Sequence, residues 1–493
     1  MIVTCAQMQD LETAAFCRGV SAAGLMEAAG KGIAGVTSQM FSKPGLLVLY
    51  LGKGNNAGDA LVAGRELQAK GWRLMARLSS EPEDMKPLPA AHWASLLGRV
   101  ERCEAVPPHQ GPLVLLDGLL GIGATRALGG TMKALAAEMN ELRRTRRACT
   151  VAMDLPSGLN GDTGEPCEDA VIADVTATVA QVKAGLVADA ALEHVGRLAV
   201  VALPELSGAP GTGREVLTPG LLRPLLPARK FGMHKGQAGR VAIVAGSRGF
   251  LGAGVLSSLG ALRGGAGLIT LCAKADAYDL LAMKVPPEVM VKQVKDYAEA
   301  AAGHDVIAVG PGLGFAHEEE VLALVREAKQ PVVVDADALT VLAKHGLGTL
   351  AGPRLLTPHP GEMSRLVAQR PEWSKLDRAT LAETFVKEHL GVTLLLKGSR
   401  SVIATAGLAT RYNTTGHPGM ATGGIGDVLT GLSAALIGQG IALHDAVSLA
   451  SWLLGRAAEV ALTSGFRSAE ALSAGDLAEG LGGAFNELRA GGW

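Results

Sequence analysis

The chain has 493 residues, which is too many for one ordinary domain and predicts two or three. Hydrophobic residues make up 48% of the chain and aromatic residues only 3%, so sizeable cores must be built from leucine, valine and alanine. The net charge of −1 argues against a broad nucleic-acid-binding surface and favours small molecules as partners.

The cysteines and the N-terminus point to a reducing compartment. The six cysteines are scattered and include no CxxC pair, which argues against a zinc ribbon and a disulfide framework and fits the cytoplasm. The first ten residues lack the basic region and the apolar core of a signal peptide. The most apolar stretch, residues 428–455, is interrupted by Gln439, His444 and Asp445, so a buried helix pair is favoured over a membrane span.

The first half of the chain begins with a helix, predicted over residues 11–40. Short apolar runs then predict strands at 46–51, 113–116 and 149–153, and a helical run through Leu67 follows the first of them. Continuous apolar strands that alternate with helices indicate a parallel sheet that is covered on both faces.

A change in composition divides the chain. Prolines and glycines accumulate over residues 203–229 and predict a linker. After it the alternation restarts, with strands predicted at 240–245, 268–271, 306–309, 332–334, 355–356 and 393–396. The sequence contains no visible repeat of about 20–50 residues, which argues against a solenoid. The sequence therefore predicts two α/β domains, residues 1–216 and 217–493.

Polar residues follow three strands of the first half at the point where each strand ends. They are Asn55, Asn56 and Asp59 after the first strand, Asp117 after the second, and Asp154 and Ser157 after the third. Ligands bind outside the carboxyl ends of strands in open parallel sheets, so these residues predict one site. Their oxygens suit a hard cation rather than zinc. Taken singly, each is more often a turn residue or a helix cap.

A second site is predicted at the glycine-rich stretch MATGGIGDVLTG, residues 420–431. Gly423, Gly424 and Gly426 carry no Cβ, so their backbone N–H groups can converge on one spot. The helix that begins near Asp427 adds its positive end to this spot. The result would be an anion hole for phosphate, with Asp427 placed to take a proton from an attacking hydroxyl. The alternative is a glycine turn with Asp427 as a plain helix N-cap.

Three segments of the first half, GNNAGDALVAGREL, DGLLGIGATR and MDLPSGLNGDTG, resemble the NAD(P)H-hydrate epimerase family in order and spacing. Ala57 and Ala60 stand where the family pattern usually has glycine. The resemblance implies a Rossmann-like three-layer fold that binds hydrated NADH or NADPH. It further implies a potassium ion held by Asn56, Asp117 and Ser157, and substrate contacts from Asn55, Asn56, Ala57, Gly58, Asp59, Gly121, Ile122, Gly123, Ala124, Thr125, Arg126, Ala127 and Asp154. A catalytic acid–base role for Asp154 is our own addition to this pattern.

The second half resembles the ribokinase-like ADP-dependent NAD(P)H-hydrate dehydratases, through HKGQAGRVAIVAGS, VGPGLG, VVVDADAL, LLTPHPGEMSRL and LLLKGSRSVIA. The resemblance implies a ribokinase-like three-layer sheet with Mg²⁺ and ADP as its cofactors. Ala253, Gly312, His359 and the catalytic Asp427 would contact the hydrated nicotinamide substrate. Nucleotide contacts are implied for Lys397, Gly398, Ser399, Arg400, Ser401 and Gly426. Asp335 and Asp337 either have a structural role or form hydrogen bonds to the groups that bind Mg²⁺.

Together the two resemblances span nearly the whole chain and imply a bifunctional enzyme, an isomerase fused to a lyase. The first domain would interconvert the R and S forms of NAD(P)H hydrate, and the second would dehydrate the S form with ADP, releasing AMP and phosphate. A cytoplasmic homo-oligomer without nucleic-acid or membrane partners is expected. The alternatives are a ribokinase-like kinase for a small vitamin precursor, and a first domain that is a non-catalytic module.

Overall fold

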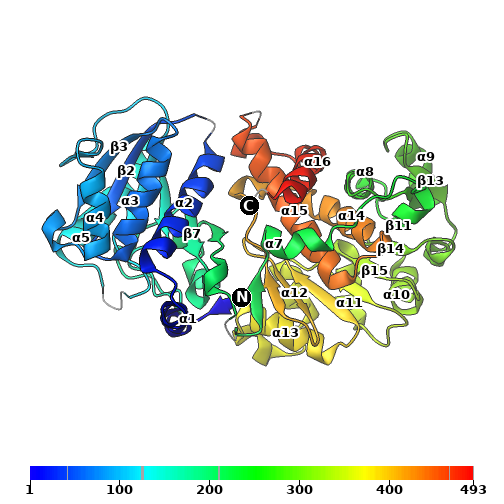
Figure 1. Ribbon diagram of the computed structural model, residues 1–493. Coiled ribbons are helices and arrows are strands. Elements are labelled where there is room, and N and C mark those ends of the chain that lie inside the picture. Colours follow the sequence, from blue (N-terminus) through cyan, green and yellow to red (C-terminus); the bar gives the residue numbers. More distant parts are fainter. Residues whose placement is uncertain (42, 124–126, 209–210, 466, 492–493) are drawn as a thin grey trace. The chain divides into compact units, whose positions relative to one another are not determined.

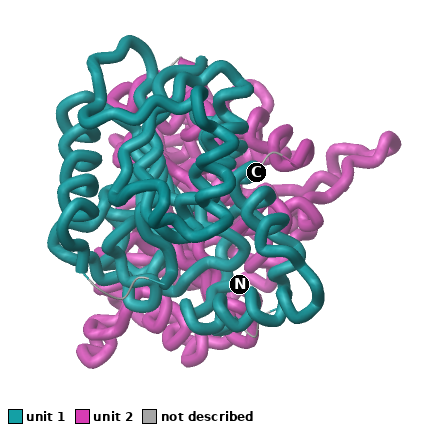
Figure 2. The backbone as a smooth tube through the Cα atoms, turned by 60° about the vertical axis from the view of Figure 1, so that its left-hand side comes forward, with its two compact units in different colours: residues 1–216 teal, residues 217–493 magenta. Residues whose placement is uncertain are grey.

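Residues 1–216 and 217–493 form two units in this computed structural model, coloured separately in Figure 2. The structure describes residues 1–41, 43–123, 127–208, 211–465 and 467–491. Each unit has a central sheet with helices packed against it, which confirms the predicted α/β fold class (Figure 1). Within the described residues, no helix is long and apolar enough to cross a lipid bilayer.

The first unit is built around a seven-stranded sheet with the order β4-β3-β2-β5-β6-β7-β9, and all neighbouring pairs are parallel. Its strands are β2 (Leu46–Leu51), β3 (Arg73–Leu78), β4 (Glu101–Arg102), β5 (Leu113–Gly118), β6 (Cys149–Met153), β7 (Val175–Val179) and β9 (Arg197–Val201). A separate parallel pair joins β1 (Ile2–Val3) to β8 (Val182–Lys183). The chain runs outward from β2 and then returns to β5, so a ligand crevice is expected where these two strands end.

Helices cover both faces of the first sheet. They are α1 (Cys5–Cys17), α2 (Ala22–Met40), α3 (Asn55–Gln68), α4 (Pro87–Ser95), α5 (Gly130–Arg146) and the short α6 (Leu192–Val195). Leu46 and Val48 pack in one core with Met139 of α5. On the opposite face, a Cβ built on Gly64 of α3 would lie 2.9 Å from Leu49 Cδ1. The alternation of side chains along β2 therefore feeds two separate cores, as expected for a buried parallel strand.

The single helix predicted over residues 11–40 is wrong, because the chain forms α1 and α2 with a break between them. Gly19 adopts φ 87°, a left-handed conformation that ends the first helix. Ser21 then caps the second helix by accepting a hydrogen bond from the Gly24 backbone N–H. The high alanine content favoured helix throughout the stretch, so the sequence analysis missed the break.

The sheet of the second unit has the strand order β19-β18-β17-β16-β15-β14-β11-β12-β13. Its strands are β11 (Arg240–Val244), β12 (Leu268–Ala273), β13 (Met290–Gln293), β14 (Val306–Val309), β15 (Val332–Val334), β16 (Arg354–Leu356), β17 (Val392–Leu396), β18 (Val402–Thr405) and β19 (Thr410–Tyr412). Pairing is parallel from β13 to β17, whereas β18 and β19 join it antiparallel. The chain leaves β11 in one direction and returns to β14, which places a second switch point between these strands.

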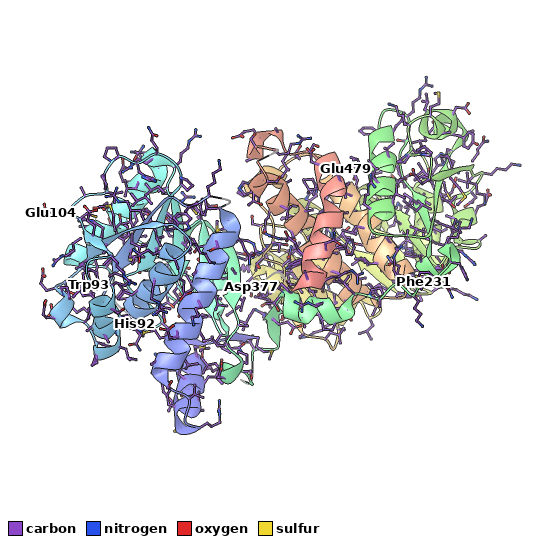
Figure 3. The ribbon with its side chains drawn as sticks, turned by 45° about the horizontal axis from the view of Figure 1, so that its top comes forward. His92, Trp93, Glu104, Phe231, Asp377 and Glu479 are labelled. Atoms are coloured by element: carbon purple, nitrogen blue, oxygen red, sulfur yellow. The ribbon has the colours of Figure 1, made fainter. Side chains whose placement is uncertain are left out.

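Helices also pack on both faces of the second sheet (Figure 1). They are α8 (Leu251–Arg263), α9 (Ala275–Ala282), α10 (Glu318–Glu327), α11 (Ala336–His345), α12 (Pro360–Leu366), α13 (Arg378–Glu388), α14 (Ile425–Gly438), α15 (Leu443–Thr463) and α16 (Ala474–Ala490). The helices α14 and α15 are the buried pair that the apolar stretch predicts. Glu479 of α16, labelled in Figure 3, accepts a hydrogen bond of 2.8 Å from Arg263 at the end of α8.

Glycines allow α14 to approach α8 closely. A Cβ built on Gly431 would lie 1.8 Å from the Ser257 carbonyl oxygen, and one built on Gly260 would lie 2.2 Å from the Val428 carbonyl oxygen. Real Cβ atoms do not approach backbone oxygens this closely, so the crossing requires glycine at both positions. The last glycine of the motif at 420–431 therefore has a packing role.

The linker predicted over residues 203–229 contains the point at which the chain divides into the two units, and parts of it have regular structure. It contains β10 (Arg214–Val216), α7 (Pro219–Leu222) and two single 3₁₀ turns. The helix α7 has an ordinary start, because Thr218 accepts a hydrogen bond from the Leu221 N–H and Pro219 occupies the first helical position. Leu222 is fully buried in the core of the second unit, which anchors α7 there.

Candidate functional site

The three residues predicted to hold a cation converge at the switch point of the first sheet. Ser157 donates from its backbone N–H and from its hydroxyl to the two oxygens of Asp117, both at 2.7 Å. The Leu120 N–H donates to the Ser157 hydroxyl at 3.0 Å, and the Asn56 side-chain amide donates to the Leu120 carbonyl at 2.8 Å. Leu120 thus links the three residues, and the Asn56 Oδ1 atom accepts no hydrogen bond within the described residues.

Asp117 lies inside β5 rather than after it and is fully buried. Burial raises the pKa of Asp117 to about 6, although the hydrogen bonds from Ser157 and Leu119 favour its charged form. A buried carboxylate without a cationic partner is a costly arrangement that a bound cation would relieve. The donor set of one amide oxygen, one carboxylate and one hydroxyl has the chemistry that a hard cation prefers.

The segment Asn55–Asp59 forms the first turn of α3, with Gly54 as its N-cap, and is not a loop. Ala57 and Ala60 are fully buried in this helix. The methyl group of Ala60 packs against Gly118, where an added Cβ would lie only 2.9 Å away. Ala60 therefore fits because the helix packs against a glycine of β5 at this position.

The other residues predicted to contact the substrate occupy α3 and the loop after β5. A Cβ built on Gly121 would lie 3.7 Å from the Asn56 side chain, which places the start of this loop at the same site. Ile122 packs on an adjoining core cluster, whereas Gly123 and Ala127 are exposed. Gly58 is buried, Asn55 is exposed and Asp59 is half-buried. Ala124, Thr125 and Arg126 lie outside the described residues.

Asp154 follows β6 and has a partner that the sequence analysis missed. Its backbone adopts φ 64°, a left-handed conformation that aspartate tolerates better than most residues. Its Oδ1 atom accepts a hydrogen bond from the ammonium group of Lys183, whose side chain is 1% exposed. The only signal for Lys183 in the sequence is one basic residue within an otherwise uncharged stretch, residues 175–188.

The predicted anion hole of the second unit lies at the start of α14. Gly424 is the N-cap, with φ 89°, and Asp427 is the third helical residue. The alternative that makes Asp427 a plain N-cap is therefore wrong. A Cβ built on Gly426 would lie 3.5 Å from both Lys397 Nζ and Asp335 Oδ2. The first turn of α14 thus presents backbone N–H groups beside a lysine ammonium, a combination that favours anions.

Buried charges surround this helix start. Asp335 is 2% exposed and accepts hydrogen bonds from Lys397 Nζ at 2.7 Å and from the Thr430 hydroxyl at 2.8 Å. Glu362, also buried, has a carboxylate oxygen 3.9 Å from Lys397 Nζ. Besides its backbone, Lys397 thus offers its side-chain ammonium, which faces Gly426, to an anion at this helix start.

Asp427 sits in this cluster as a half-buried carboxyl group without a hydrogen-bond partner among the described residues. Burial, followed by the negative charge of Asp335, raises the pKa of Asp427 to about 7, while Lys397 acts in the opposite direction. A general base works best when its pKa lies near the working pH, so this carboxyl group is suited to accept a proton.

Of the residues predicted to line the nicotinamide site, Ala253 and Gly312 follow β11 and β14, whereas His359 follows β16. Gly312 has φ 63°, and a Cβ built on it would lie 2.8 Å from the Ala253 methyl group, so the two residues are neighbours. His359 is the N-cap of α12: its Nδ1 accepts a hydrogen bond from the Gly361 N–H at 3.0 Å. Asp337 accepts a hydrogen bond from the Gly314 N–H at 2.9 Å, which favours the structural reading of this residue.

The segment 397–401 forms the turn after β17. The Arg378 guanidinium donates to the Lys397 carbonyl oxygen at 3.3 Å, and the Ser401 hydroxyl donates to the Gly398 carbonyl oxygen at 3.3 Å. Gly398 and Ser399 are exposed, whereas Arg400 is buried. Within the described residues, no group of three or more His, Cys, Asp or Glu side chains is arranged to hold a metal ion.

Comparisons with known proteins agree with this division of the chain. Residues 22–185 match the family model described as YjeF-related protein N-terminus, and residues 241–478 match the model of NAD(P)H-hydrate dehydratase. The chain is 36% identical over 467 residues to a bifunctional NAD(P)H-hydrate repair enzyme of Moorella thermoacetica, covering 88% of this chain and 86% of the relative. A relative of the same description from Gloeobacter violaceus is 36% identical over 476 residues, covering 92% and 91%.

A solved structure supports the same assignment for the second unit. The ADP/ATP-dependent NAD(P)H-hydrate dehydratase from Bacillus subtilis, co-crystallised with ATP and Mg²⁺, is 31% identical, with a TM-score of 0.50. The match covers 56% of this chain and 100% of the dehydratase chain. On the evidence of the matches along its length, the chain belongs to the family of bifunctional NAD(P)H-hydrate repair enzymes.

Proposed function

We propose that this chain repairs hydrated NADH and NADPH in two steps, with one step in each unit. The first unit interconverts the R and S epimers of the hydrate, and the second dehydrates the S epimer at the expense of ADP. The observation that carries the proposal is the start of α14, where Asp427, with its pKa raised to about 7, lies in the same turn as Gly426 and close to Lys397. Family membership supports the choice of substrate.

The chemistry of the second unit follows from the poor leaving ability of hydroxide. Asp427 accepts the proton of the substrate hydroxyl, whose oxygen attacks the terminal phosphorus of ADP. The N–H groups at the start of α14 and the Lys397 ammonium stabilise the charge on the transferred phosphoryl group. AMP leaves first. Loss of phosphate from one ring carbon and of a proton from its neighbour then restores the double bond.

Mg²⁺ fits this site as an ion shared with the nucleotide. Asp427, Asp335 and Glu362 supply carboxylate oxygens near the anion hole, yet the described residues include no preformed cage of acidic ligands. Such a donor set is typical of Mg²⁺, which is usually bound by one or two carboxylates together with substrate phosphates and water. When bound, the ion would offset negative charge on the phosphates.

In the first unit, Asp154 is proposed as the acid–base residue. Epimer exchange can proceed by ring opening: as the hydroxyl loses its proton, its oxygen forms a carbonyl group, and the ring C–N bond at the same carbon breaks with its electron pair on nitrogen. The nitrogen then adds to the opposite face of the carbonyl carbon, and the oxygen regains a proton. Asp154 accepts the hydroxyl proton in one direction and returns it in the other. Asn56, Asp117 and Ser157 would hold K⁺ nearby, which would compensate the buried carboxylate of Asp117 and fix the loop at Gly121.

One assay tests the proposed reactions. The full chain is given a mixture of hydrated NADH epimers with ADP and Mg²⁺, and the absorbance of the reduced nicotinamide is followed. Complete recovery at a rate above that of spontaneous epimer exchange requires both activities, whereas rapid recovery of only the S fraction would refute the epimerase assignment. A parallel assay with purified R epimer and no nucleotide isolates the first step.

The kinase alternative predicts a different product. A ribokinase-like kinase would release a stable phosphate ester and would not restore the reduced-nicotinamide absorbance. Repeating the assay with ATP in place of ADP measures the nucleotide preference. The homo-oligomeric assembly, the cytoplasmic location and the absence of nucleic-acid partners stay predictions, and size-exclusion chromatography with light scattering tests the first of them.

A further inference from the structure

The buried lysine of the first unit has no role in the proposed reaction as stated so far. Lys183 ends β8, and its ammonium group donates to Asp154 Oδ1, to the Thr178 hydroxyl at 3.2 Å and to the Val179 carbonyl oxygen at 3.0 Å. These three bonds use every donor of the ammonium group. Its side chain is 1% exposed, so it cannot reach the substrate directly.

The two oxygens of Asp154 are treated differently by the protein. Oδ1 accepts from Lys183, from the Val179 N–H at 3.1 Å and from the Thr178 hydroxyl at 3.3 Å. Within the described residues, no donor is directed at Oδ2. One oxygen is thus fixed by three protein donors, and the other keeps its lone pairs for a ligand.

Other acidic groups face Asp154 from the neighbouring helices. They are Cys5 and Glu12 of α1 and Asp59 of α3. Burial, followed by the charges of Asp154 and Glu12, raises the pKa of Asp59 well above its usual value, and burial likewise raises the pKa of Glu12. Burial, with Asp162 and other charges, raises the pKa of the Cys5 thiol to about 12. Among these groups, only Asp154 bonds to the lysine ammonium.

We infer that Lys183 is a positioning residue of the epimerase site, whose ammonium holds Oδ1 of Asp154 and leaves Oδ2 as the oxygen that accepts the substrate proton. The inference rests on the proposed epimerase function of the first unit. It also explains which of the clustered carboxyl groups acts as the base. The Lys183 ammonium bonds to Asp154, whereas burial and neighbouring negative charges favour the neutral forms of Asp59 and Glu12.

The test is the pH profile of epimer exchange, measured on the full chain between about pH 6 and pH 9. In the parent protein, where the ammonium bonds to Asp154, the turnover number is expected to stay constant from about pH 6 to pH 8. In Lys183→Met, Asp154 lacks its cation but keeps its acidic neighbours, so it binds a proton more readily. Turnover at neutral pH is expected to fall at least about tenfold and to recover in part at high pH, with KM little changed.

Two further variants separate charge from structure. Lys183→Arg keeps a cation and should retain the parental pH midpoint even where turnover falls, whereas Asp154→Asn should be inactive at every pH. If Lys183 serves only the fold, Lys183→Met will lower the melting temperature and reduce turnover by the same factor at every pH. That parallel profile would overturn the inference.

The parent profile keeps the inference testable if the lysine variants do not fold. A parental turnover that rises steeply through neutral pH would overturn it without any variant. A parent that does not exchange epimers faster than a no-enzyme control would instead refute the proposed epimerase function itself. Exchange by the parent combined with a parallel Lys183→Met profile refutes only the role of Lys183.

Discussion

Each unit presents a carboxyl group that we propose for proton transfer, but the surroundings of the two groups differ. Asp154 of the first unit bonds directly to a buried ammonium. In the second unit, Lys397 bonds to Asp335 instead, and Asp427 is left with a pKa raised to about 7 by burial and by the charge of Asp335. Asp154 therefore has a direct cationic partner, whereas Asp427 has a pKa at which it can gain and lose a proton near neutral pH.

This difference suits the reactions proposed for the two sites. Epimer exchange returns the proton to the same substrate, so a base fixed in one state between turnovers is sufficient. Phosphoryl transfer brings further negative charge to Asp427, and a lysine engaged by Asp335 stays beside Gly426, where the phosphate is expected. In the proposed mechanisms, the lysine of the first unit holds the base itself, whereas the lysine of the second unit is held by a different carboxylate and stays available to the phosphate.

The largest effect is expected for Asp427→Asn, which removes the proposed base of the second unit. General bases contribute about 10²–10⁴ in rate, so dehydration should fall at least about a hundredfold. Epimer exchange should be unchanged. The melting temperature should change little, because the N-cap of α14 is Gly424 and not this residue. Turnover near the parental value would remove Asp427 from the mechanism.

Asn56→Ala breaks the proposed cation site of the first unit. Loss of one ligand and of its hydrogen bond to the Leu120 carbonyl should reduce epimer exchange about ten- to a hundredfold and weaken its dependence on K⁺. The rate of epimer exchange is measured as a function of K⁺ concentration. Asn55→Ala is the matched control: its side chain is exposed, so the K⁺ dependence should persist. An unchanged K⁺ response in Asn56→Ala would show that the ion, if any, binds elsewhere.

Gly431→Ala tests whether the two sites fail separately. The added methyl group would meet the Ser257 carbonyl oxygen, and such overpacking costs about 1–3 kcal/mol of stability. Heat inactivation of dehydration should therefore begin at a lower temperature, while epimer exchange keeps its parental inactivation temperature. Gly482→Ala in α16, whose built Cβ meets no atom within 4 Å, is the control and should leave both activities unchanged. Joint loss of both activities in Gly431→Ala would contradict separate failure.

The smallest expected effect is the pH dependence of dehydration in the parent. Because Asp427 with a pKa of about 7 must be ionised to accept a proton, the rate should fall about tenfold from pH 8 to pH 6. In Asp335→Asn, the midpoint should move to lower pH, since a negative charge next to Asp427 is removed. A parental profile that is flat over this range would contradict the assigned pKa direction.

The strands that the sequence predicted well are the apolar ones. The predictions at 46–51, 149–153, 306–309 and 332–334 match β2, β6, β14 and β15, because strands buried on both faces are continuous apolar runs. The strand Arg73–Leu78 was missed because two arginines interrupt its apolar pattern. Likewise, Val175–Val179 was missed because its threonines weaken the apolar signal, although both are fully buried.

The parts of the candidate sites that lie within short sequence motifs could be predicted from the sequence. The motif at 420–431 indicated the anion hole, and the strand ends indicated the cluster of Asn56, Asp117 and Ser157. The hydrogen bonds of Lys183 and Lys397 were not predictable, since each joins residues that only the folded sheets bring together. Glu362 stood within the quoted TPHPGE segment, but its burial beside Lys397 depends on the packing of α12.

The placement of both units on one polypeptide has a consequence for flux. Separate proteins can drift in relative abundance as their synthesis and degradation change, whereas one translation product always supplies the two active sites in equal number. The ratio of the two activities is then set by the properties of the two sites and not by their relative abundance. A substitution that slows epimer exchange cannot be offset by making more of that unit alone.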